Sequence, residues 1–121
     1  MDPEAFKQYL AALSEQYRAS LSEKLAHIEH FWAMLSAGST AAGPMAALHR
    51  ELHSLAGSAK TFGLPEVSEA ARAAEFFIEP YCLVGALPAA PTLAEFEHLL
   101  AELKRKASVA PDGDAVTRRV R

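Results

Sequence analysis

The residues best suited to chemistry lie between positions 49 and 63, in the stretch HRELHSLAGSAKTFG. If this stretch is helical, each residue turns by about 100°, and His53 lies about 140° from the centre of the apolar stripe. The imidazole then points to solvent, and Ala56 and Gly57, one turn later, leave space beside it. Lys60 follows about 10 Å further along the axis. Such an exposed imidazole near a cation suits a nucleophile that accepts an anionic group; the alternative is an ordinary surface histidine beside a helix-packing glycine.

The spacing of apolar residues predicts helices along most of the chain. Apolar residues recur every three or four positions over 6–35, 48–62, 67–81 and 93–107. Alanine is abundant, whereas the β-branched residues Val and Ile are scarce. Short connections make successive helices antiparallel, so we expect an all-α, up-down antiparallel four-helix bundle.

Several residues mark where these helices begin and end. Pro44 suits the first position of the second helix, and Gly63 suits a left-handed cap at its end. Pro80 kinks or ends the third helix. Thr92, with Glu95 three residues later, has the pattern of a capping box and predicts the start of the last helix.

The sequence also makes predictions for the two ends of the chain. The first stripe, over 6–35, fits either one long helix or two, with a break near Ser14 or Ser20 that creates an extra N-terminal helix. Beyond the last stripe the sequence has no periodicity. We therefore expect the bundle to occupy 1–108 and a mobile tail to occupy 109–121.

Composition limits the class of protein before any activity is considered. The chain has 121 residues, with 12 Lys and Arg against 15 Asp and Glu, giving a formal charge of −3. This length fits one domain, and the mild acidity does not favour a nucleic-acid binder. The apolar runs are shorter than the roughly 20 residues of a membrane-spanning helix, and the N-terminus lacks the pattern of a signal peptide. A single cysteine suits a reducing compartment, so we expect a cytoplasmic protein. We also expect it to be a monomer.

His53 and the ten residues after it resemble the signature of histidine-containing phosphotransfer (HPt) domains. That signature has Leu two residues after the histidine, Gly at four, a small pair, an apolar residue at nine and Gly at ten. The matching residues here are Leu55, Gly57, Ser58, Ala59, Phe62 and Gly63. The likeness extends more loosely over the helical order from about 3 to 107.

This resemblance implies a phosphocarrier and not an enzyme in the narrow sense. HPt domains take a phosphoryl group from the aspartyl phosphate of a receiver domain and return it to the Asp of another receiver. The expected partners are therefore receiver domains of response regulators or of hybrid histidine kinases. Mg²⁺ belongs to the receiver, so we expect no cofactor and no metal on this chain, and neither nucleic acid nor membrane as a partner.

The resemblance also implies roles for individual residues. His53 is the phosphoacceptor, and Gly57 gives room beside the phosphorylated imidazole. Many family members carry Lys three residues after the histidine, where this chain has Ala56. Lys60, or more weakly Arg50, would then supply the supporting cation.

Other residues near His53 carry weaker expectations. His49 is one turn away and would flank the docking site of a partner. Phe76 lies about 180° from the centre of its own apolar stripe, so it either packs on a second helix face or docks a receiver. If the first two helices are antiparallel and the turn between them is centred near Thr40, His27 lies opposite His53. A zinc site with His49 is conceivable there, but ordinary surface histidines are the simpler interpretation.

Two rival functions remain open at this stage. One is a helical adaptor that binds a receiver or a histidine kinase without being phosphorylated. The other is a metal-binding bundle. Phosphorylation of His53 by a receiver separates the phosphocarrier from both.

Overall fold

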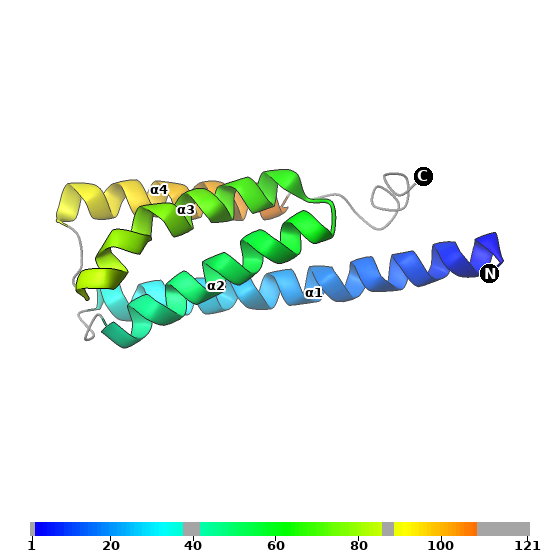
Figure 1. Cartoon of the computed structure of the whole chain (residues 1–121), viewed down its shortest axis with the longest axis horizontal. Coiled ribbons are helices and arrows are strands. Elements are labelled where there is room, and N and C mark those ends of the chain that lie inside the picture. Colours follow the sequence, from blue (N-terminus) through cyan, green and yellow to red (C-terminus); the bar gives the residue numbers. More distant parts are fainter. Residues whose placement is uncertain (1, 38–41, 86–88, 109–121) are drawn as a thin grey trace.

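The computed structural model describes residues 2–37, 42–85 and 89–108, which form four α-helices (Figure 1). The helices are α1 (Pro3–Ser36), α2 (Ala42–Thr61), α3 (Pro65–Val84) and α4 (Ala90–Ser108). Successive helices run in opposite directions, so the expected all-α, up-down bundle is confirmed. No helix in these three ranges is long and apolar enough to cross a membrane. The predicted tail over 109–121 lies outside the described residues.

α1 is one uninterrupted helix of 34 residues, so the break near Ser14 or Ser20, and with it the extra N-terminal helix, is wrong. Ser14 is buried and Tyr17 continues the same buried face, so the apolar stripe passes through this region without a change of phase. Asp2 caps the start of the helix, because its side chain accepts a hydrogen bond from the backbone N–H of Ala5. The N-terminal part of α1 extends beyond the other three helices (Figure 1).

A tight turn joins α2 to α3 and sets their antiparallel packing. Gly63 has φ 76°, the left-handed conformation predicted for it. The N–H of Leu64 donates to the carbonyl of Ala59 across this turn, at 2.8 Å, as in a Schellman cap. Pro65 then occupies the first position of α3, where its missing N–H costs nothing. With so short a connection, α3 folds back directly along α2.

Two predicted helix starts are displaced. α2 begins at Ala42, two residues before Pro44, and α4 begins at Ala90, two residues before Thr92. The capping box of Thr92 and Glu95 is therefore wrong, since Thr92 lies inside the helix. The first four N–H groups of any helix lack an intrahelical partner, so a proline is tolerated anywhere in the first turn and does not have to open it.

α3 continues through Pro80 and ends at Val84. Of the two expectations for Pro80, the end of the helix is therefore wrong. The proline lies at an exposed position, and its missing N–H removes one hydrogen bond of the helix. The helix ends instead at Gly85, which has φ 66° and donates its N–H to the carbonyl of Tyr81 at 2.9 Å.

Most of the core comes from the four predicted stripes. Its largest fully or almost fully buried side chains are Ile28 and Leu35 from α1, Met45, Leu48, Leu52 and Leu55 from α2, Val67 and Ile78 from α3, and Phe96 and Leu103 from α4. Two positions differ from the prediction: Met45 is buried although it precedes the second stripe, and Phe6, which opens the first stripe, is 42% exposed. Aromatic pairs reinforce the packing between helices: Tyr17 stacks on Phe62 with ring centroids 4.3 Å apart. One face of α2 is therefore buried and consists largely of leucines, whereas polar residues lie on its opposite, exposed face.

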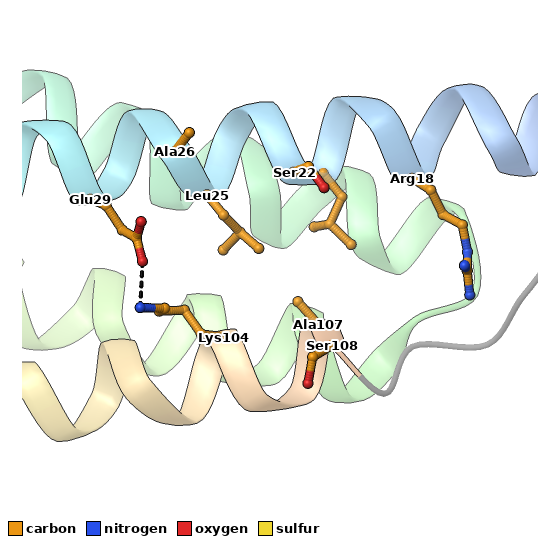
Figure 2. Close-up of a pocket in the computed structure, with 9 residues that line it drawn as sticks. Arg18, Ser22, Leu25, Ala26, Glu29, Lys104, Ala107 and Ser108 are labelled. Atoms are coloured by element: carbon orange, nitrogen blue, oxygen red, sulfur yellow. Dashed lines mark ion pairs between the residues drawn. The ribbon is translucent and has the colours of Figure 1, made fainter.

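α1 and α4 are in contact at one end and separated at the other. Trp32 packs edge-on against Phe96, with ring centroids 4.9 Å apart. Further along, a groove of about 420 Å³ opens between the two helices, lined by side chains that include Leu25 and Ala107. An ion pair between Glu29 and Lys104 crosses it (Figure 2). We refer to this feature as the α1–α4 groove.

Candidate functional site

His53 lies in the middle of α2, on the side away from the core. Its neighbours Leu52 and Leu55 are fully buried, whereas the His53 side chain is 75% exposed. The helical pitch explains this difference, because residues one position apart are about 100° apart around the axis. The predicted exposure of the imidazole is confirmed.

Glu75 on α3 contacts the inner nitrogen of the His53 ring. Its Oε2 lies 2.7 Å from His53 Nδ1, and its side chain is only 14% exposed. A carboxylate can only accept, so Nδ1 carries the proton of this hydrogen bond. In the neutral ring, Nε2 then keeps its lone pair, which makes Nε2 the nucleophilic atom.

His49 lies one turn before His53 and also faces Glu75. The two imidazole rings are nearly parallel, with an interplanar angle of 12° and centroids 6.5 Å apart. His49 Nε2 is 3.6 Å from the Oε2 of Glu75, and this nitrogen is buried without a hydrogen-bond partner in the part of the chain that the structure describes. The His49 side chain is 30% exposed, so most of its ring is turned inward; its predicted part in docking a partner stays a prediction.

A hollow of about 290 Å³ opens beside the imidazole; we refer to it as the His53 hollow. It is lined by His53, Ala56 and Gly57 from α2 and by Arg72, Glu75 and Phe76 from α3. A Cβ added to Gly57 would meet nothing within 4 Å, so the space that the sequence predicted beside this residue is open. Ala56 differs: it is 3% exposed, and its carbonyl accepts a 2.7 Å hydrogen bond from Ser68 on α3. Ala56 therefore packs against α3, and Gly57 provides the open space.

The cation that lines the His53 hollow is Arg72, which is not among the residues that the sequence predicted. Lys60 and Arg50 are exposed on α2, and neither lines the hollow. Arg72 is three residues before Glu75, a spacing that places both on one face of α3. That spacing is visible in the sequence, but it identifies the site only when the position of α3 against α2 is known.

Phe76 lies at the rim of the same hollow and is 63% exposed. Of the two interpretations of this residue, packing on a second helix face is therefore wrong. An exposed aromatic ring beside a reactive group is a feature of docking surfaces. Its contact with a partner stays a prediction.

His27 does not reach His53, contrary to the antiparallel count. His27 Nδ1 lies 3.8 Å from a carboxylate oxygen of Glu51, and Lys24 Nζ donates to Ser54 Oγ at 3.0 Å. The residue of α1 that lies opposite His53 is therefore nearer Lys24 than His27. The prediction counted residues outward from the centre of the turn between the two helices, whereas the packing of the core side chains sets the register between α1 and α2. Among the described residues, no group of three or more His, Cys, Asp or Glu side chains could hold a metal ion.

Comparison with known proteins agrees with this geometry. The family model described as Hpt domain matches residues 12–115, which is most of the chain. The chain therefore belongs to the Hpt domain family, as the motif around His53 indicated. Neither the curated proteins nor the solved structures gave a significant match. Hpt domains take part in histidine phosphotransfer within phosphorelay signalling, where they interact with receiver domains and kinases.

Proposed function

We propose that this protein is a phosphocarrier whose His53 accepts a phosphoryl group from the aspartyl phosphate of one receiver domain and passes it to the Asp of another. The observation that carries the proposal is the 2.7 Å contact between His53 Nδ1 and Glu75 on an imidazole that is 75% exposed. The contact assigns the free lone pair to Nε2, and the exposure lets a second protein bring its phosphoryl group to that atom. All of these residues come from α2 and α3 of one chain, which supports action as a monomer.

The transfer step balances with the groups available. The lone pair of His53 Nε2 attacks the phosphorus, and the bond between phosphorus and the Asp oxygen breaks. The Asp of the receiver leaves as a carboxylate. The proton stays on Nδ1, so the phosphorylated ring is positively charged, and the Glu75 carboxylate stabilises that charge. Onward transfer reverses the step: an Asp oxygen of the next receiver attacks the phosphorus and the P–N bond breaks.

Two residues of the His53 hollow suit the phosphoryl group itself. The open space at Gly57 accommodates its oxygens next to the ring. The guanidinium of Arg72 is a planar, permanently charged donor that matches phosphate oxygens. We therefore assign to Arg72 the supporting role that the sequence predicted for Lys60. The Mg²⁺ required for the chemistry at the aspartyl phosphate is expected on the receiver.

The test is a transfer assay with the purified protein. A receiver domain carrying labelled aspartyl phosphate and Mg²⁺ is mixed with the wild type and with His53→Gln. His98→Gln, which replaces an exposed histidine on α4, is the control. We expect an acid-labile, base-stable label on the wild type and the control, and none on His53→Gln. A wild type without label, or a label that persists in His53→Gln, contradicts the proposal. Binding of the receiver without any label would favour the adaptor function instead.

A further inference from the structure

His49 and His53 face the same carboxylate oxygen from successive turns of α2. Glu75 Oε2 is 2.7 Å from His53 Nδ1 and 3.6 Å from His49 Nε2. The distance to His53 Nδ1 is that of a hydrogen bond, whereas the distance to His49 Nε2 is slightly too long for one. His49 Nε2 is nevertheless buried, and it has no hydrogen-bond partner among the described residues.

A buried ring nitrogen without a partner is costly, and the nearby carboxylate can satisfy it. Each carboxylate oxygen has two lone pairs, so Oε2 can accept a second hydrogen bond while it keeps the one from His53. A small rotation of either side chain closes the gap to hydrogen-bond length. The negative charge also selects the tautomer of His49: a proton on Nε2 is attracted to Oε2, whereas a lone pair there is repelled.

We propose that His49 is a positioning residue for phosphoryl transfer, acting through Glu75. Its Nε2–H donates to Oε2 and holds the carboxylate beside α2. Glu75 in turn keeps the proton of His53 on Nδ1 and the lone pair on Nε2. The two histidines thus have opposite tautomers around one carboxylate. The consequence for transfer rests on the proposed function of His53, while the effect on its tautomer does not.

The test compares two variants of His49 that differ in one property. His49→Phe keeps a flat ring of similar size but removes the donor. His49→Gln places an amide N–H close to the position of the original Nε2–H. His98→Phe, at the exposed histidine on α4, controls for the loss of a histidine elsewhere. The tautomer of His53 is measured from the ¹⁵N chemical shifts of its ring nitrogens, in the absence of any receiver.

We expect the wild type, His49→Gln and His98→Phe to show His53 protonated mainly on Nδ1, and His49→Phe to show a mixture of the two tautomers. The rate of phosphoryl transfer to His53 should fall by about three- to tenfold in His49→Phe, as for the loss of one hydrogen bond of ordinary strength. The rate should recover in His49→Gln. A simple packing role for His49 predicts the opposite order, with Phe tolerated better than Gln.

The inference is overturned if His49→Phe keeps the wild-type tautomer, or if His49→Gln loses it as His49→Phe does. If His49→Phe does not fold, His49→Leu makes the same comparison, because it also lacks a donor. Since the ¹⁵N spectra involve no receiver, this result is separate from the transfer assay. A wild type that takes no label contradicts the proposed function but leaves the tautomer measurement valid.

Discussion

Two sides of the bundle carry hollows, and they differ in what lines them. The α1–α4 groove is the larger, at about 420 Å³; Leu21, Leu25, Ala26 and Ala107 line it together with polar residues, and the Glu29–Lys104 pair crosses it (Figure 2). The His53 hollow between α2 and α3 is smaller, at about 290 Å³, but a histidine, a glutamate and an arginine line it. In the groove both partners of the ion pair are about half exposed, whereas Glu75 is 14% exposed.

This difference shows that the volume of a hollow does not by itself identify the functional site. A reaction requires groups of complementary chemistry held at fixed distances, and partial burial strengthens their interactions. The α2–α3 pair provides this because its short turn at Gly63 holds the two helices in close packing. The α1–α4 groove leaves room, but the residues that line it include no histidine.

Removal of the Glu75 carboxylate should have the largest effect on transfer. In Glu75→Ala, the rate of phosphoryl transfer to His53 should fall by about 10- to 100-fold, as when a group that orients a reactive histidine is lost. The reason is that nothing then holds the proton on Nδ1. Single-turnover transfer from a phosphorylated receiver measures this rate. Glu79→Ala, one turn later on α3, is the matched control, and an equal loss there would contradict the role of Glu75.

Removal of the cation should have the next largest effect. In Arg72→Ala, the transfer rate should fall by about tenfold, as expected for one hydrogen bond to a charged group. Lys60→Ala should leave the rate unchanged, because Lys60 does not line the His53 hollow. The same transfer assay measures both variants. If Lys60→Ala is the slower of the two, the supporting cation is Lys60, as the sequence predicted.

Gly57→Ala separates stability from function. The added Cβ meets nothing within 4 Å, so the variant should gain helix propensity without a clash. Its free energy of unfolding should rise by about 0.5–1 kcal/mol, measured by chemical denaturation. Transfer should slow by about threefold, because the methyl group enters the space for the phosphoryl oxygens. A variant that is both more stable and fully active would show that this space is not used.

The smallest effect is expected on the opposite side of the bundle. Lys104→Met breaks the exposed pair with Glu29, and such pairs contribute at most about 1 kcal/mol and often nothing measurable. Its free energy of unfolding should change by about 0.5 kcal/mol or less, and transfer to His53 should be unchanged. Thermal denaturation and the transfer assay test both points. A clear loss of transfer would mean that the α1–α4 groove takes part in the reaction and would remove the contrast between the two sides.

The elements of the fold and the position of His53 follow from local patterns. Apolar residues three and four positions apart predicted the helices, and the same rotation predicted that His53 faces solvent. The left-handed turn at Gly63 followed from its place after the stripe. The helix starts were less well predicted: Pro44 lies inside the first turn of α2, where a proline is tolerated, and Thr92 lies inside α4 and does not cap it.

The partners of His53 could be established only from the tertiary structure. Glu75 is 22 residues away in the sequence, and Arg72 and Phe76 lie on the same helix, α3. The sequence predicted Lys60 as the supporting cation, because the periodicity of one helix shows only the neighbours on that same helix. What the sequence determined by itself was the main buried face of each helix, while the exposure of Phe76 and the burial of Ala56 followed only from the packing of α2 against α3. Which exposed residues meet was decided by the register of α3 against α2, because that register depends on how the core side chains of both helices pack together.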